Sequence, residues 1–184
     1  MVSVIMPVRD EGVLVARAVR SVMAQDFAGG IEILLVDDAS RDGTAAEAAA
    51  EAARHPRADA AFRVIPLATA GGNAGAFAAG LAAARGRFWH VLDGDDYWID
   101  PAKLDRQVEM LTSYPVLSAV AHRTLVRDEI DGTETVHPDA DPVEHVIDLE
   151  DILLGGVYVH TSSVLFRNLW WDAAAGCTRV PAIF

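Results

Sequence analysis

Four short apolar runs, separated by segments with helical spacing, restrict the folds that the first half of this chain can adopt. The runs are residues 2–6, 31–36, 62–67 and 88–92. Strands that alternate with helices form βαβ units, which build a mostly parallel sheet covered by helices on both faces. In such sheets, ligands bind at the carboxyl ends of the strands, where the strand order reverses. The pattern therefore predicts an α/β fold with a binding site at that edge.

Three carboxylates directly follow the fourth apolar run. Asp93, Asp95 and Asp96 fall within four positions, at the point where the strand would leave the core. Burying three carboxylates without partners is too costly, so these side chains must face water or a cation. Hard oxygen ligands on one loop suit Mg²⁺ or Mn²⁺, especially where the metal also holds a phosphate. An isolated Asp-x-Asp turn is more often solvated than ligating, but the strand-end position favours a metal site here.

Polar clusters also follow the other three apolar runs, at residues 9–11, 37–38 and 73–75. The carboxyl ends of parallel strands share one edge of a sheet, so these clusters are expected to converge with the aspartates. In isolation, a helix-capping turn and a ligand site explain Asp37 and Asp38 equally well. The convergence with the other clusters favours the ligand site.

The segments between the runs predict three helices, over residues 15–22, 44–54 and 73–84. Asp42 or Thr44 would cap the second helix. Gly86 would end the third helix as a glycine C-cap.

The second half of the chain changes character. Asp100 and Pro101 predict the start of a helix, as its N-cap and its first helical residue. Residues 116–126 are strand-like, and Asp131-Gly132 carries the signal of a hairpin turn. The remaining expected elements are a loop over 137–145, a short helix capped by Asp148 and ended by Gly155-Gly156, a strand over 157–167 and a final helix over 168–175.

Composition and charge exclude several classes of protein. A chain of 184 residues suits one domain, and its formal net charge of −12 argues against nucleic acid as a partner. An anionic ligand would need local help from a cation, glycine-rich backbone or a helix N-terminus. Cys177 is the single cysteine, so no internal disulfide can form. The N-terminal stretch does not resemble a signal peptide, and no apolar segment is long enough to span a membrane, which together predict a cytoplasmic protein.

Familiar glycine-rich nucleotide motifs are missing from the sequence. The turn over residues 7–12, after the first apolar run, has no G-x-G-x-x-G. The glycine-rich stretch 71–75 matches neither that fingerprint nor a P-loop. Dinucleotide-dependent enzymes and P-loop enzymes are therefore disfavoured.

Five segments occur in an order and at a spacing that carry a family resemblance. They are VSVIMPVRDE, ILLVDDASRDGT, GGNAGAFAAGLAAARGRFWHVLDGDD, DPAKLDRQVEML and VYVHTSSVLFR. Over residues 2–167 the chain resembles a family 2 glycosyltransferase of the GT-A fold. The resemblance implies a Rossmann-like three-layer sandwich with a mostly parallel central sheet. It also implies an inverting enzyme that transfers a sugar from a nucleoside diphosphate sugar to an acceptor hydroxyl, with a divalent metal, Mg²⁺ or Mn²⁺, as cofactor.

The implied chemistry suits the aspartates, because a divalent cation on their loop can neutralise a diphosphate leaving group. By resemblance, Asp95 binds the metal, with Asp96 as its close competitor. Asp93 then contacts the ribose or the water shell of the metal, and Asp38 bonds the nucleobase, while Asp37 holds its loop. The expected nucleotide contacts are Pro7, Val8, Arg9, Glu11, Asp38, Asn73, Gly75, Asp93, Gly94 and Asp95.

Four residues are candidates for the side of the donor sugar or the acceptor, namely Trp98, His160, Thr161 and Ser162. For His160, a half-buried strand histidine bonded to backbone is an equally good explanation. Trp89 and His90 lie inside the fourth apolar run and are expected in the core.

Two departures from the family pattern bear on the donor. Family members often carry an aromatic ring at the position of Arg9 and an Asn at that of Asp10, although an Arg plane can also stack on a base. Where the family has a phosphate-binding Arg, this chain has Phe77 and Ala78. Phosphate binding is therefore expected to depend on the metal and the backbone, and UDP is the default nucleotide.

No residue is identified as the catalytic base. The family places an Asp or Glu beyond the HTSS segment, usually in an acidic pair, whereas Asp172 comes too early and has no acidic partner. The base is therefore expected beyond Phe184, and the chain alone is expected to bind nucleotide but to transfer sugar poorly. A single domain over 1–184 would comprise a nucleotide-sugar half, 1–100, and a C-terminally truncated acceptor half, 101–184.

The acceptor stays open among a glycan, a lipid-linked intermediate and a protein. A lipid-linked acceptor would bring the enzyme to the inner face of the membrane as a peripheral protein. Apolar surface exposed by truncation would favour a homo-oligomer. Two alternative functions remain, a nucleotide-sugar-binding domain without catalysis and a sugar nucleotidyltransferase. The second would need a glycine-rich loop with Arg and Lys after the first strand, which the sequence lacks.

Overall fold

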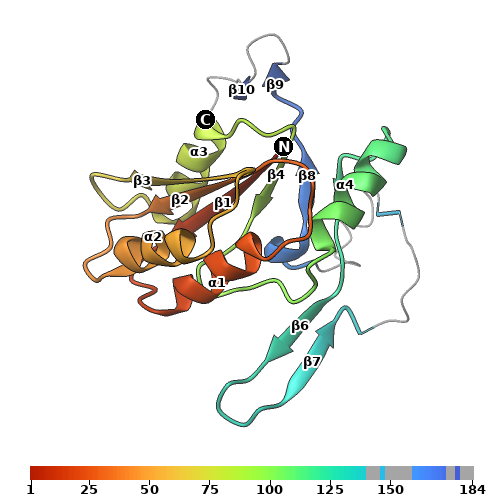
Figure 1. Ribbon diagram of the computed structural model, residues 1–184. Helices are drawn as coiled ribbons and strands as arrows, with labels where there is room; N and C mark the ends of the chain where they lie inside the picture. The colour runs from red at the N-terminus through yellow and green to blue at the C-terminus, as the bar shows by residue number, and fades with distance from the viewer. Residues whose placement is uncertain (140–145, 148–158, 173–176, 179–184) are drawn as a thin grey trace.

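Figure 1 shows the computed structural model, which describes residues 1–139, 146–147, 159–172 and 177–178. A six-stranded sheet forms its centre, in the order β3-β2-β1-β4-β8-β5. The first four strands in this order run parallel, and β8 runs antiparallel to both of its neighbours. The predicted α/β fold with a mostly parallel sheet is therefore confirmed. The strands are β1 (Val2–Val8), β2 (Ile31–Asp37), β3 (Ala60–Pro66), β4 (Phe88–Val91), β5 (Ala119–Val120) and β8 (Leu165–Arg167).

Helices cover both faces of the sheet and complete three layers (Figure 1). Helices α1, α2 and α4 pack on the face where Val4 and Met6 of β1 point, and α3 packs on the opposite face against Ile5. Successive strand residues point to opposite faces, so β1 supplies both clusters and is buried along its whole length. The helices are α1 (Leu14–Met23), α2 (Thr44–Arg54), α3 (Gly72–Ala83) and α4 (Lys103–Ser113).

The strand order reverses at β1. β2 and β3 lie on one side of it and β4 on the other, so the carboxyl ends of β1, β2 and β4 meet at one edge. Backbone hydrogen bonds continue the pairing just past the strands, from the Asp38 N–H to the Val8 carbonyl (2.9 Å) and from the Leu92 N–H to the Ile5 carbonyl (3.0 Å). The polar clusters that follow these strands are consequently brought together.

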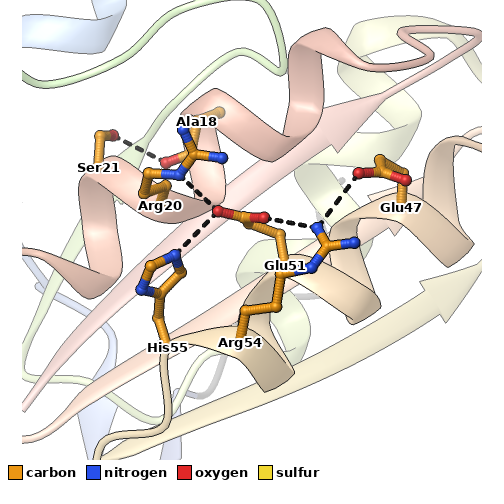
Figure 2. Close-up of polar contacts among 7 residues, drawn as sticks. All are labelled: Ala18, Arg20, Ser21, Glu47, Glu51, Arg54 and His55. Atoms are coloured by element: carbon orange, nitrogen blue, oxygen red, sulfur yellow. Dashed lines mark hydrogen bonds and ion pairs between the residues drawn. The ribbon is translucent and has the colours of Figure 1, made fainter.

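A buried carboxylate fastens α2 to α1 (Figure 2). Glu51 of α2, whose side chain is 1% exposed, accepts hydrogen bonds from Arg20 of α1 (2.5 Å) and from Arg54 (2.8 Å). The His55 ring nitrogen Nε2 lies 3.0 Å from the same carboxylate. The hydrogen bond from Arg20, and then that from Arg54, lowers the pKa of Glu51 to about 2. The Glu51 cluster therefore holds a charged carboxylate in a place where an unpaired charge would be costly.

Gly86 does not have the predicted role of a glycine C-cap. Helix α3 ends at Ala83, and Gly86 instead donates its N–H to Ser3 Oγ of β1 (2.7 Å). A Cβ at this position would lie 2.5 Å from the Phe88 carbonyl oxygen and 2.6 Å from the Ser3 nitrogen. The glycine is needed because backbone approaches backbone closely, and the sequence pattern of a helix end does not distinguish the two reasons.

The second half agrees with the predictions in part. Helix α4 begins at Lys103, after a turn in which Asp100 Oδ1 accepts the Ala102 N–H (2.9 Å). The strand-like segment 116–126 is divided between β5 in the main sheet and β6 (Thr124–Arg127) in a separate hairpin. β6 pairs with β7 (Glu134–His137), and Gly132 at the turn has a φ of +76°, as the Asp-Gly signal predicted.

The end of the described chain differs from the prediction. The expected strand over 157–167 is replaced, where it is described, by the 3₁₀ helix η1 (Thr161–Ser163) and the short β8. Instead of a helix from Asn168, residues 169–170 form a turn and β9 (Trp171–Asp172) pairs with β10 (Cys177–Thr178), so that prediction was wrong for these residues. The helix expected between Asp148 and Gly156 lies outside the described residues. Within the part of the chain that the structure describes, no helix is long and apolar enough to cross a membrane.

Candidate functional site

A cavity of about 300 Å³ opens at the edge where the strand order reverses. It is polar, because the ends of β1, β2 and β4 and the first turn of α3 supply its walls. Of the residues expected to contact a nucleotide, Gly75 and Gly94 do not line it. The lining residues are Pro7, Val8, Arg9, Glu11, Asp38, Asn73, Ala76, Asp93 and Asp95.

Gly94 packs against two of the residues that line the cavity, Val8 and Glu11. A Cβ at Gly94 would lie 2.8 Å from Cγ1 of Val8 and 3.0 Å from Cγ of Glu11. Glycine at this position therefore lets the loop after β4 pack directly against the end of β1. This packing places Asp93 and Asp95 beside Glu11.

Asp38 is almost completely buried at the base of the cavity, with an exposure of 4%. Its two carboxylate oxygens accept the N–H groups of Gly71 (2.5 Å) and Gly72 (3.0 Å), at the N-terminus of α3. Nη1 of Arg9 lies 3.7 Å from Oδ2 of the same carboxylate. Asp38 thus connects the start of α3 to the one cationic side chain among the lining residues.

Hydrogen bonds join the loop that follows β1 to the loop that follows β2, at the edge of the cavity. Asp37 accepts the Ser40 N–H through Oδ1 (2.9 Å), so it holds its own loop as expected. Asp10, at a φ of +55°, accepts the Arg41 N–H (2.7 Å) and donates its own N–H to Ser40 Oγ (3.1 Å). Aspartate tolerates this left-handed backbone better than most residues, which explains how Asp10 serves where an Asn is common.

The carboxylates at the mouth of the cavity repel one another. Burial, followed by the charges of Asp96 and Asp95, raises the pKa of Asp93. Burial also raises the pKa of Glu11, with further contributions from Asp95, Asp93 and Asp42. A cation bound among these side chains would relieve that repulsion.

The described residues do not bring three acidic, histidine or cysteine side chains into one preformed metal cluster. Asp93 and Asp95 nevertheless line the cavity with hard oxygen donors. Mg²⁺ typically takes only one or two carboxylates and completes its shell with water and phosphate oxygens. The donor set therefore fits a cation that arrives with a phosphate-bearing ligand.

Asp96 turns away from the cavity towards the second half of the chain. Its Oδ2 accepts a hydrogen bond from the Ser162 hydroxyl in η1. His160 and Thr161 precede Ser162 at the start of η1, and the His160 ring lies 6.2 Å from that of His137. His160, Thr161 and Ser162 thus lie beside the loop that follows β4, residues 93–97, which we call the aspartate loop, although they do not line the cavity.

Trp98 has no free face for a sugar. It is 7% exposed, and its ring packs edge-to-face with that of His90, with the ring centroids 4.8 Å apart. Nζ of Lys103 lies 4.3 Å from the centroid of the Trp98 ring. Trp98, which was expected on the sugar side, is instead packed in the core. Its neighbour Tyr97 is the exposed aromatic residue of this loop. Trp89 is stacked on Phe166 with ring centroids 4.0 Å apart, consistent with the packing role expected for it.

Two residues beside the site were not singled out from the sequence. Lys103 is buried, and its Nζ donates to Oε1 of Gln107 and lies beside Nε2 of His90, at 2.7 Å from each. Burial lowers the pKa of Lys103 well below its ordinary value, and burial followed by the charge of Lys103 does the same for His90. Arg17 of α1 reaches the aspartate loop through the Asp95 carbonyl (3.4 Å). The signal for Lys103 was its i, i+4 spacing to Gln107 on the apolar face of α4, whereas no local pattern marks Arg17.

Two curated proteins are similar to this chain in sequence. The uncharacterised protein Rv1520 of Mycobacterium tuberculosis is 35% identical over 139 residues, which are 75% of this chain and 38% of that protein. The UDP-Glc:alpha-D-GlcNAc-diphosphoundecaprenol beta-1,3-glucosyltransferase WfgD of Escherichia coli is 33% identical over 111 residues, covering 60% of this chain and 41% of that protein. The chain therefore spans well under half the length of these curated relatives.

Solved structures of glycosyltransferases have a similar fold. The mannosyltransferase PcManGT of Pyrobaculum calidifontis, solved with GDP-Man and Mn²⁺, has a TM-score of 0.66 at 23% identity, over 91% of this chain and 44% of that one. S. aureus TarS 1-349 in complex with UDP-GlcNAc has a TM-score of 0.54 at 28% identity, over 62% of this chain and 32% of that one. Residues 3–170 match the model of a family described as Glycosyl transferase family 2. Fold, family match and relatives agree, and the chain belongs to glycosyl transferase family 2.

Proposed function

We propose that this chain binds a nucleoside diphosphate sugar and transfers the sugar to an acceptor hydroxyl with inversion of configuration, assisted by a divalent metal. One observation carries the proposal: the polar cavity at the strand reversal is lined by Arg9 and Asp38 on one side and by Asp93 and Asp95 on the other. A nucleotide placed between them would have its base at the first pair and its diphosphate at the second. UDP is the donor nucleotide that we test first, as the resemblance implies.

The residues of the cavity divide into two groups in this proposal. Pro7, Val8, Arg9 and Asp38 would hold the base, with the Asp38 carboxylate accepting a base N–H and the Arg9 guanidinium donating to a carbonyl. Asn73, which lines the cavity from the first turn of α3, would face the phosphates together with the positive end of that helix. Asp93 and Asp95, with Asp96 as the competing ligand, would hold Mg²⁺ or Mn²⁺. The bound cation would stabilise negative charge on the departing diphosphate.

The acceptor side would be formed by η1. The bond from Ser162 to Asp96 joins η1 to the aspartate loop. In this proposal His160, Thr161 and Ser162 would therefore border the place where a sugar leaves the diphosphate. The acceptor of the E. coli relative is, by its name, a sugar on a lipid diphosphate. We infer that the acceptor here is also a sugar hydroxyl, and we assign no residue as the base that takes its proton.

Calorimetry tests the donor site. UDP, GDP and dTDP are titrated into the protein with Mn²⁺ and again with EDTA, and we expect UDP to bind at least tenfold more weakly without metal, a loss of about 1.4 kcal/mol. Asp95→Asn should remove most of that metal dependence. Asp105→Asn, an exposed change in the first turn of α4, is the matched control and should leave binding unchanged. If none of the three nucleotides shows metal-dependent binding, the proposed function is wrong.

Product analysis tests the transfer step separately. The protein is incubated with the nucleotide sugar selected by calorimetry and a sugar acceptor, and the anomeric configuration of the product is read by NMR. An inverted product supports the proposal, and a retained one contradicts it. Tight nucleotide binding with little product is the result expected if the base lies outside residues 1–184, and a longer natural version of the protein is then assayed in the same way. Absence of product from that version too would identify a binding domain without catalysis.

A further inference from the structure

Arg17 makes three contacts that the cavity itself does not explain. It projects from α1 and does not line the cavity. Nη2 donates to the Asp95 carbonyl (3.4 Å), and the guanidinium carbon lies 4.3 Å from the centroid of the Tyr97 ring. Nη1 donates to Oε1 of Glu129 (2.8 Å) at the tip of the β6–β7 hairpin. One side chain therefore connects α1, the aspartate loop and the hairpin.

The position of these contacts on the loop is informative. Asp95 and Tyr97 flank Asp96, whose carboxylate is bonded to Ser162. Arg17 consequently holds the loop on either side of Asp96, through the Asp95 carbonyl and the Tyr97 ring, and none of these contacts uses the carboxylate of Asp95 or Asp96. A guanidinium is suited to this arrangement, because its fork donates in two directions while its plane stacks on a ring. A lysine at the same place would offer a single point charge.

The hairpin needs a contact of this kind to have a defined position. β6 and β7 form a two-stranded sheet of their own and extend away from the main sheet (Figure 1). Most side chains of the hairpin are exposed, among them Leu125, Val126 and Val136. Two-stranded hairpins without a packed face are marginally stable in water. The Arg17–Glu129 pair fixes the tip, while the contact of His137 with His160 lies at the opposite end, beside η1.

Resting on the proposed function, we propose that Arg17 is a positioning residue that couples the β6–β7 hairpin to the aspartate loop, which makes the hairpin a wall of the acceptor side. Donor binding that orders the loop also orders the hairpin, because Arg17 contacts both the Asp95 carbonyl and Glu129. The pair is partly exposed, with Arg17 at 38% and Glu129 at 62%, so its effect is on the position of the hairpin rather than on the stability of the fold.

Hydrogen exchange measured by mass spectrometry tests the coupling. The hairpin contains backbone bonds whose opening can be followed, such as those from Asp128 N–H to Thr133 O and from Gly132 N–H to Asp128 O, both 2.9 Å. Arg17→Gln is expected to speed exchange over residues 124–137 by about fivefold, since it removes the contact at the tip. Glu129→Gln breaks the same pair from the hairpin side, at an exposed position that the fold does not depend on, and should have a similar effect.

Arg20→Gln is the matched control. Arg20 lies one turn further along α1 and contacts Glu51 of α2, so this change should leave hairpin exchange as in the unaltered protein. Arg17→Lys, which keeps the charge but not the fork, should restore part of the protection. If Arg17→Gln and Glu129→Gln both leave hairpin exchange unchanged, the coupling is refuted.

Addition of UDP and Mn²⁺ separates coupling from a merely structural contact. We expect the ligands to slow hairpin exchange in the unaltered protein and to have at most a small effect in Arg17→Gln. Equal protection by the ligands in both proteins would overturn the proposal. If calorimetry shows that UDP and Mn²⁺ do not bind at all, the donor site is wrong, while exchange without ligand still decides whether Arg17 positions the hairpin.

Discussion

The Glu51 cluster permits a quantitative prediction for the substitution Glu51→Gln. The pKa of Glu51 is lowered from 4.5 to about 2 by the hydrogen bonds from Arg20 and Arg54. A pKa difference of that size between the folded and unfolded states would amount to about 3 kcal/mol at neutral pH. Both arginine side chains are 58% exposed, however, so water screens them. We therefore expect Glu51→Gln to reduce the free energy of unfolding by about 1–2 kcal/mol.

The pH dependence of this effect follows from the sign of the shift. The folded pKa lies below the unfolded one, so the stabilisation is complete above the unfolded value of 4.5 and is lost as the pH falls towards 2. Urea denaturation at pH 7 and at steps down to pH 3 should show the difference between the two proteins shrinking. Glu47→Gln is the control, because Glu47 is 38% exposed and lies 3.5 Å from Arg54, and it should cost less than about 0.5 kcal/mol. Equal stabilities at pH 7, or a difference that stays constant down to pH 3, would refute the reasoning.

Two further predictions concern buried positions that do not line the cavity. Gly86→Ala should lower the free energy of unfolding by about 1–3 kcal/mol in urea, because the new Cβ would meet the Phe88 carbonyl oxygen at 2.5 Å. Gly43→Ala, with no atom within 4 Å of the new Cβ, should cost only about 0.5 kcal/mol, from the preference for glycine over alanine at the N-cap of α2, and an equal loss in both would contradict this account. Lys103→Met should reduce the gain in stability between pH 7 and pH 9, since burial lowers the folded pKa of Lys103 and the unfolded chain binds the extra proton below about 10.5. If the free energy of unfolding rises by the same amount between pH 7 and pH 9 in Lys103→Met and in the unaltered protein, Lys103 is not the cause of that gain.

The order and type of the first elements could be predicted from the sequence because burial leaves a strong pattern. β1 and β2 are mostly apolar since the sheet is covered on both faces, and the two polar side chains inside them, Ser3 and Glu32, are hydrogen-bonded to each other. The predicted ends of both strands lie within two residues of the observed ones. The polar residues after these strands could be assigned to one site for the same reason, as parallel strands share an edge.

The less predictable parts depend on contacts between distant segments. The sequence around Gly86 is typical of a helix end, but glycine is needed there because Ser3, 83 residues away in the chain, approaches its backbone closely. A tryptophan that follows an acidic loop, such as Trp98, could face a ligand or the core. Trp98 lies in the core because His90 of β4 and Lys103 of α4 pack against its ring. Residues 116–126 have one continuous composition, yet they serve two different sheets. No pattern local to any of these segments contains that information.

If the proposed function is right, the charges of the cavity would make a cation a condition of donor binding rather than an addition to it. Four carboxylates, Glu11, Asp38, Asp93 and Asp95, line the cavity against the single guanidinium of Arg9, in a chain with a net charge of −12. Asp38 is further neutralised by the N–H groups of Gly71 and Gly72, but burial and mutual repulsion raise the pKa of both Glu11 and Asp93. A diphosphate brought into this field without a counter-ion would meet repulsion from the loop that must hold it. A divalent ion bound with the diphosphate reverses the sign of that interaction, so the same aspartates that exclude the bare anion would select its metal complex.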